Sequence, residues 1–210
     1  MLGRHNLYPN LEWWYIDFLP LWKYNDAMDN EMKLQLAQSI RDFRLPRYRE
    51  LPDMGLYLEQ TTKYLNQCLG TLGCGEVTGS MIRNYVKMGM VANPVKKQYY
   101  IDHIAHLISI TLLKNVLSLE HIHALFLRQR KVYTDEVAYN YFCAELENLM
   151  RYQFGLQDQI LEIGMSQSLE KEMLRSAITA VCHSIYLNAC FRNLKREEAS
   201  EKAGPDKPVS

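Results

Sequence analysis

The sequence predicts an all-α protein, because three helical features recur along the chain after residue 30. Apolar residues are spaced three or four apart, which is the period of an amphipathic helix. Threonine or serine precedes several of these segments as a potential N-cap, and glycine follows several of them as a potential stop. With 48% hydrophobic residues in 210, the chain can also build a substantial core. We therefore expect a globular arrangement of helices joined by turns.

The first 30 residues are expected to form an arm rich in aromatic side chains. They hold the three tryptophans of the chain, Trp13, Trp14 and Trp22, and also Pro9 and Pro20, which argue against a long helix. Aromatic rings bury much area for little lost conformational entropy, so we expect the tryptophans to pack on their own domain or on a sister subunit. An aromatic lid over a small ligand is the alternative.

Two helices and a linker are expected next. Residues 31–43 and 54–69 carry apolar residues at helical spacing, and the second helix has Asp53 as its expected N-cap and Gly70 as its expected stop. The linker at 70–77 contains three glycines, which predicts a flexible connection.

The most informative segment is a short helix expected at residues 79–88. Thr78 is a potential N-cap, and Gly89 can take the left-handed conformation that ends a helix. Four polar side chains fall at positions i, i+3, i+4 and i+7 and therefore share one face: Ser80, Arg83, Asn84 and Lys87. The opposite face carries Met81, Ile82, Tyr85 and Val86. Such a polar stripe suits the major groove of DNA, and the alternative is a solvated helix face.

A basic turn follows this helix. Pro94 fixes a turn, and residues 94–99 are expected to form a small wing with Lys96 and Lys97 at its tip and Tyr99 on its return. Between residues 76 and 100, four basic side chains stand against one acidic side chain, whereas the whole chain has 24 of each sign. Any nucleic-acid site is therefore expected to be local to this segment.

The rest of the chain is expected to be helical. Asp102, Ser118 and Thr134 stand at the start of three helices, and a longer helix is expected from 168 to 195. The longer helix has two apolar rows spaced by four, which fits packing inside a globular bundle better than a two-stranded coiled coil. The polar residues 196–210 are expected to form a disordered tail.

Residues 78–125 resemble MerR-type transcription regulators. The shared order is a cap, a small polar residue, Ile-Arg with an aromatic two residues on, a Gly-hydrophobic pair, a proline, a basic wing ending in tyrosine, an acidic-led helix and a Ser-Leu-x-x-Ile turn. The matching residues are Thr78, Ser80, Ile82, Arg83, Tyr85, Gly89, Met90, Pro94, Tyr99, Asp102, Ile104, Leu107, Ser118, Leu119 and Ile122. The block from Phe43 onward also resembles an uncharacterised bacterial family described only as a domain of unknown function.

The resemblance implies a MerR-like winged helix-turn-helix core at about residues 44–130. The expected parts of the chain are the arm at 1–30, the core at 31–131, a C-terminal helical region at 132–195 and the tail at 196–210. The linker at 70–77 is longer than the turn of those regulators, and Asn84 stands where they usually carry an aromatic residue. The expected packed last helix also differs from their exposed dimer coil.

The function that these features imply is that of a cytoplasmic bacterial transcription regulator. It would bind duplex DNA as a homodimer through helix 79–88 and the basic wing at 94–99. The residues expected to contact DNA are Ser80, Arg83, Asn84, Tyr85, Lys87, Lys96, Lys97 and Tyr99. The alternative is a helical protein-interaction or small-molecule-binding module that keeps the winged core only as a scaffold. The sequence identifies neither an operator nor an effector.

Membrane insertion, metal binding and catalysis are not expected. The apolar run at 13–22 is ten residues long and interrupted, too short to cross a bilayer. Five widely spread cysteines without a Cys-x-x-Cys pair predict reduced thiols in a cytosol. The pairs His103/His106 and His121/His123 do not offer the three or four converging ligands that a metal needs. No catalytic motif or phosphate-binding glycine loop is apparent, so no cofactor is expected.

Overall fold

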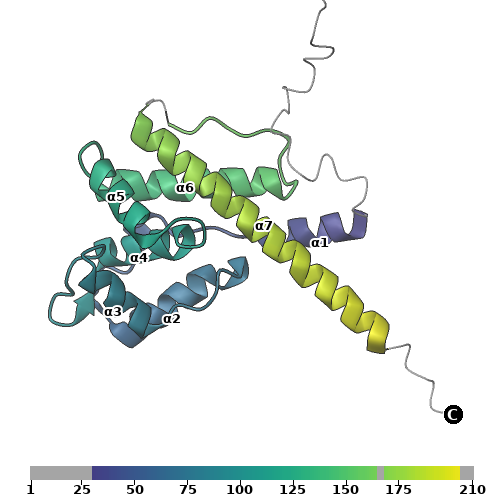
Figure 1. Cartoon of the computed structure of the whole chain (residues 1–210), viewed down its shortest axis with the longest axis horizontal. Coiled ribbons are helices and arrows are strands. Elements are labelled where there is room, and N and C mark those ends of the chain that lie inside the picture. Colours follow the sequence, from purple (N-terminus) through teal and green to yellow (C-terminus); the bar gives the residue numbers. More distant parts are fainter. Residues whose placement is uncertain (1–29, 165–167, 204–210) are drawn as a thin grey trace, which may run out of the picture.

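Helices dominate the protein, as the sequence predicts (Figure 1). The computed structural model describes residues 30–164 and 168–203, with side chains through residue 199. The elements in chain order are α1 (Asn30–Ile40), the 3-10 turn η3 (Tyr48–Glu50), β1 (Leu56–Tyr57), α2 (Leu58–Leu69), the 3-10 turn η4 (Gly70–Leu72), α3 (Gly79–Lys87), β2 (Gln98–Tyr99), α4 (Ile101–Leu113), α5 (Leu119–Gln129), α6 (Asp135–Gln153) and α7 (Leu169–Ala203). No helix among these residues is both long enough and apolar enough to span a bilayer. The expected contacts of Trp13, Trp14 and Trp22 lie outside the described residues.

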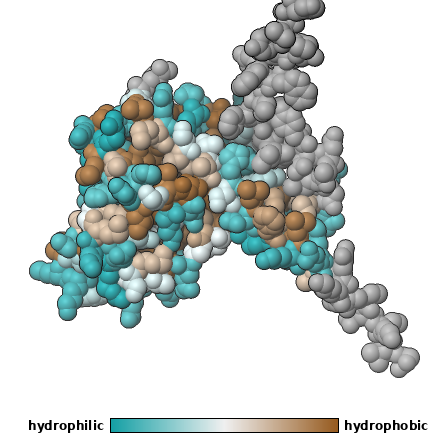
Figure 2. All heavy atoms as spheres, in the orientation of Figure 1, coloured by the Kyte–Doolittle hydropathy of each residue, from teal (hydrophilic) through white to brown (hydrophobic). Residues whose placement is uncertain are grey.

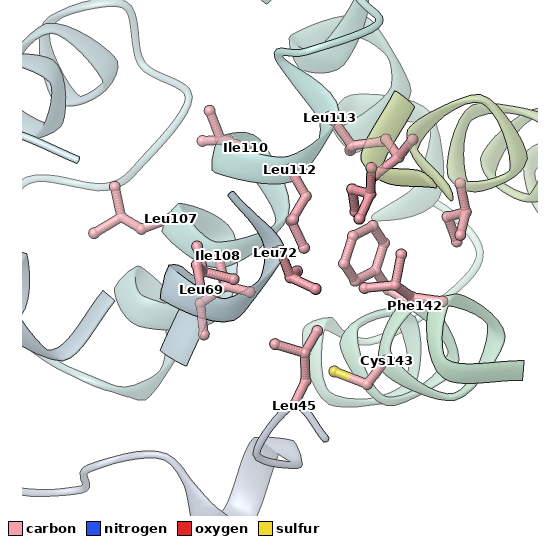
Figure 3. Close-up of a cluster of buried hydrophobic side chains, with 14 of the residues drawn as sticks. Leu45, Leu69, Leu72, Leu107, Ile108, Ile110, Leu112, Leu113, Phe142 and Cys143 are labelled. Carbon is pink, nitrogen blue, oxygen red and sulfur yellow. The ribbon is translucent and has the colours of Figure 1, made fainter. Parts of the chain in front are cut away.

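Helix α4 lies at the centre of the fold. Every residue from His103 to Leu113 except His106 is buried. Helix α4 packs against α2 on one side and against α6 and α7 on the other, and α5 also contacts it. Figure 3 shows leucines and isoleucines of α4 in one buried cluster with Leu69 of α2, Leu72 of η4 and Phe142 of α6. The lobe that carries α2 and α3 is therefore joined to the C-terminal helices through one apolar core.

Local capping explains where several helices begin. The side chains of Thr78, Ser118 and Thr134 each accept a backbone N–H from three residues on, so the three expected N-caps are confirmed. The expectation for α2 was wrong, because Asp53 lies before β1 and the helix begins only at Leu58. The expected stop is confirmed, because α2 ends at Leu69 and Gly70 is its C-cap. It keeps a right-handed conformation and opens η4, which ends at Gly73 with φ +65°.

The glycine-containing linker makes defined contacts with the core and with α2. Leu72 and Val77 are buried at its two ends. The side-chain amide of Asn66 on α2 accepts the N–H of Val77 at 2.8 Å and donates to the Val77 carbonyl at 3.0 Å. One side chain thus satisfies both backbone groups of a buried residue, which holds the chain against α2 just before α3 begins.

Helix α7 packs across α6 and continues past it beside α1 (Figure 1). Its buried side chains include Leu174, Ile178, Val181, Cys182 and Ile185, which confirms the expected packing in a helical bundle. The helix continues to Ala203, so residues 196–203 are helical where a disordered tail was expected. Residues 204–210 lie outside the described residues.

An ion pair between a buried carboxylate and a partly exposed arginine joins α6 to α7. Glu145 is fully buried, and its Oε1 lies 2.9 Å from Nε of Arg175. Burial raises the pKa of Glu145, and the charge of Arg175 opposes that rise. Glu162 and Lys171 also act on this carboxyl group, with opposite signs. The interior charge is thus only partly compensated, and desolvation works against the ionised form.

Replacing Asn66 tests the role of the linker clamp. Asn66→Ala leaves the buried N–H and carbonyl of Val77 without their partner, so it is expected to lower the free energy of unfolding by about 1–3 kcal/mol in chemical denaturation. Gln67→Ala, one position along on the exposed face of α2, is the matched control and should change it by less than about 0.5 kcal/mol. Equal effects of the two variants would show that the linker is not held in this way.

The buried carboxyl group predicts a pH dependence of stability. A raised folded pKa means that the contribution of Glu145 is fully present below its ordinary value of 4.5 and is lost as the pH rises through the folded pKa. The wild type should therefore lose stability relative to Glu145→Gln as the pH rises from about 4.5 towards neutrality. Thermal unfolding at several pH values measures this. Glu162→Gln, a largely exposed neighbour of the same arginine, should follow the wild type.

Candidate nucleic-acid interface

Helix α3 presents opposite chemistry on its two faces. Ile82 and Tyr85 are buried, and the partly buried Met81 and Val86 pack against the core. The predicted polar stripe is exposed along its whole length: Ser80, Arg83, Asn84 and Lys87. The apolar face therefore fixes the helix to the protein, and the polar face remains available for a partner.

Gly89 sets the direction in which the chain leaves α3. Its φ of +71° is the left-handed conformation predicted for it. The N–H of Met90 then donates to the carbonyl of Tyr85 at 3.0 Å, across the end of the helix, and Met90 and Val91 are buried. This is the hydrogen bond and apolar contact of a Schellman-type ending. The exit of α3 is thus fixed in space.

A tight hairpin follows, with two lysines at its tip. Val95 and Gln98 exchange backbone hydrogen bonds of 3.0 and 2.9 Å. Lys96 and Lys97 between them have φ values of +50° and +67°. Two left-handed turn residues are typical of a type I′ hairpin, where Asn-Gly is the preferred pair. Lysine at both positions is strained, and strain of this kind is concentrated at functional sites.

The hairpin is anchored to the elements on either side of it. Strand β2 pairs antiparallel with β1, with Leu56 opposite Tyr99. A Cβ atom at Gly55 would lie 2.7 Å from Cβ of Gln98, so this close approach requires glycine. At the start of α4, His103 Nδ1 accepts the N–H of Tyr100, and its Nε2 donates to the carbonyl of Asn93 at 3.3 Å. The tip lysines therefore project from a supported loop.

The cations of this surface have no acidic partner. Arg83, Lys87, Lys96 and Lys97 are exposed and form no ion pair with the described residues. Elsewhere, six arginines are paired with carboxylates: Arg44, Arg47, Arg49, Arg128, Arg130 and Arg175. Unpaired charge on a fixed surface is suited to an anionic partner.

Two predicted contact residues belong to the core instead. Tyr85 is 3% exposed and Tyr99 is 4% exposed, so neither ring forms part of the polar surface. Burial raises the pKa of the Tyr99 phenol, and the nearby charge of Arg83 opposes that rise. The Tyr99 ring therefore belongs to the core beneath the exposed surface. The guanidinium of Arg83 lies close enough to β2 for its charge to act on the Tyr99 phenol.

The groove between α2 and α3 adds residues that the sequence analysis missed. Its lining includes Arg83 together with Lys63, Glu59 and Glu76. No local motif singles out Lys63, because only the packing of α2 on α3 brings it to this groove. The two carboxylates make the groove itself close to neutral, so phosphate contacts are favoured on the side of Lys87 and the hairpin.

His106 contributes to structure in the first half of α4. His106 Nδ1 contacts the Asp102 carbonyl at 2.6 Å, and Nε2 lies 2.9 Å from an Arg130 nitrogen and 3.7 Å from Asp135. Burial lowers the pKa of His106, which favours a neutral ring joining α4 to the segment between α5 and α6. Within the described ranges no three His, Cys, Asp or Glu side chains converge as a metal site would require.

One family model covers the segment that carries this surface. Residues 46–142 match DUF1836, a domain of unknown function. The match runs from η3 into α6 and so includes β1, α2, α3, the hairpin, α4 and α5. No curated protein and no solved structure matches the chain. The match therefore supports the expected link to a family of unknown function and assigns no activity to it.

Relieving the strain at the hairpin tip should stabilise the protein. The double variant Lys96→Asn/Lys97→Gly supplies the residues preferred in a type I′ turn, so the free energy of unfolding should rise by about 1 kcal/mol in chemical denaturation. Lys131→Asn, an exposed lysine after α5, controls for the lost charge and should leave it unchanged within about 0.5 kcal/mol. A loss of stability in the double variant would contradict the turn geometry.

Proposed function

We propose that the protein is a DNA-binding transcription regulator. The observation that carries this proposal is the set of four cations on α3 and the hairpin that form no ion pair with the described residues, in a chain whose net charge is zero. A protein with zero net charge has no general affinity for polyanions. A nucleic acid would therefore bind where the cations are concentrated, on this surface.

The polar stripe and the hairpin have different chemical roles in the proposal. Ser80, Arg83 and Asn84 offer a hydroxyl, paired guanidinium donors and an amide, which can form hydrogen bonds with base edges in the major groove. Lys87, Lys96 and Lys97 neutralise phosphates and set the orientation of the protein. The hydrogen bond of 3.3 Å from Arg83 to Ser80 Oγ orients the guanidinium along the exposed face.

In this proposal β1, α2, α3 and the hairpin act as a winged helix-turn-helix unit of the MerR type. The helix order, the short sheet that ties the hairpin to the start of α2, and the exposed α3 all support it. The proposal includes a homodimer in the bacterial cytoplasm, because one helix rarely supplies enough contact area for specific binding.

The alternative, a protein-interaction module, is favoured by one feature of α7. Leu187, Phe191 and Leu194 lie at i, i+4 and i+7 and are 49%, 61% and 42% exposed. Apolar surface is visible along this helix in Figure 2. An exposed apolar stripe is typical of a protein contact. A module of this kind would use α7 and would have no affinity for DNA.

Salt dependence distinguishes these functions. If the three lysines of each subunit neutralise phosphates in a dimer, log K for duplex DNA should fall with log salt at a slope of about −5, whereas a monomer would give about −3. Fluorescence anisotropy with pooled genomic duplexes measures this slope. No binding at low salt would exclude the regulator and leave the interaction module.

Two substitutions test the separate roles of the stripe and the hairpin. Arg83→Ala should cost about 1–3 kcal/mol against preferred duplexes and relax sequence preference. In Lys97→Asn the charge is removed, and the new residue, asparagine, tolerates the left-handed conformation of this position. This variant should weaken all duplexes alike and reduce the salt slope by about one per subunit. Lys131→Ala is the control for charge outside the interface and should bind like the wild type. If Arg83→Ala weakens all sequences equally, the stripe contacts no bases.

A further inference from the structure

A second candidate site lies in the C-terminal half of the protein and shares no residue with the α3 surface. It is a cavity of about 330 Å³ between the end of α5, the first half of α6 and the start of α7. This volume is at the lower end of the range for small-molecule sites. Its walls are mainly apolar and include Val137, Ala138, Ala144, Ile163 and Leu174.

Tyr141 lines this cavity and carries a hydroxyl group that no described residue uses. Its hydroxyl oxygen is buried without a hydrogen-bond partner among the described residues. Burial raises the pKa of Tyr141 to about 12, so the hydroxyl keeps its proton at physiological pH. A buried hydroxyl without an acceptor costs free energy, which a ligand acceptor would recover.

Lys171 places a positive charge beside the same ring. The side chain of Lys171 is 10% exposed, and Nζ lies 5.7 Å from the centre of the Tyr141 ring. The ammonium donates one hydrogen bond of 2.7 Å, to the Gly164 carbonyl, and its carboxylate neighbour Glu162 is 3.6 Å away and largely exposed. An ammonium has three donors, so it retains capacity for a ligand.

We propose that this cavity binds a compact organic carboxylate with an apolar body. The apolar walls would hold the body, and the Tyr141 hydroxyl and Lys171 ammonium would hydrogen-bond the carboxylate oxygens. A charge-assisted pair of donors discriminates against both neutral and cationic analogues of the same length. The nearby Glu145 carboxylate is paired with Arg175, which limits its repulsion of an anion. The site does not depend on DNA binding.

The test uses probes that share a tail and differ in head group. Octanoate and 3-phenylpropanoate are titrated into the full chain and followed by ligand-observed NMR, with octan-1-ol and octylammonium as neutral and cationic counterparts. We expect both carboxylates to bind and octylammonium not to bind. The proposal is overturned if neither carboxylate binds, or if octanoate, octan-1-ol and octylammonium bind equally well.

Matched variants locate the binding. Tyr141→Phe removes one oxygen atom and should weaken octanoate roughly five- to tenfold, whereas Tyr57→Phe, on an exposed tyrosine, should have no effect. Lys171→Met should abolish the preference for octanoate over octan-1-ol. Unchanged melting temperatures of the variants confirm that they fold. Equal octanoate affinity in Tyr141→Phe and Tyr57→Phe would place the ligand elsewhere and contradict the assignment.

Discussion

The burial of α4 is the constraint on which the rest of the structure depends. Ten of the residues from His103 to Leu113 are buried, so other side chains must cover this helix on nearly all sides. Helices α2, α5, α6 and α7 supply that cover. Helix α4 follows the hairpin directly and packs on α2. Its burial therefore also fixes the positions of the hairpin and of α2, which support the candidate interface. It also brings α6 and α7 together around the second cavity.

The candidate interface shows how apolar anchoring leaves polar chemistry exposed. Ile82 and Tyr85 are held by the core, so α3 cannot rotate its polar stripe inward without exposing them. The Asn66 clamp fixes the approach to α3 and Gly89 fixes its exit. Four cations then face solvent without acidic partners, in a protein that pairs many of its other arginines. Lys96 and Lys97 at the hairpin tip are strained. This is consistent with positive charge being required there for binding, even though it lowers local stability.

Local features were predictable from the sequence, and tertiary ones were not. The caps at Thr78, Ser118 and Thr134 and the left-handed Gly89 depend on side chains within a few residues, so residue type was sufficient. The 3.6-residue period separated the two faces of α3. The same period placed Tyr85 on the apolar face, yet the family resemblance led to its assignment as a contact residue. Burial of Tyr99, the Asn66 clamp and the cavity beside Tyr141 all depend on segments distant in sequence. Composition alone predicted a flexible linker and could not reveal the contacts that the structure gives it, because three glycines do not indicate that Leu72 and Val77 are buried.

The most direct measurement of the central claim is a map of the surface that DNA contacts. Backbone amide chemical shifts of the full chain would be followed during titration with short duplex DNA at low salt. The account predicts that the largest changes cluster in residues 79–88 and 94–99, with smaller ones in the part of α2 near Lys63 and none along α7. Changes that concentrate on α7, or no changes at DNA concentrations in large excess, would contradict the assignment of α3 and the hairpin as a nucleic-acid interface.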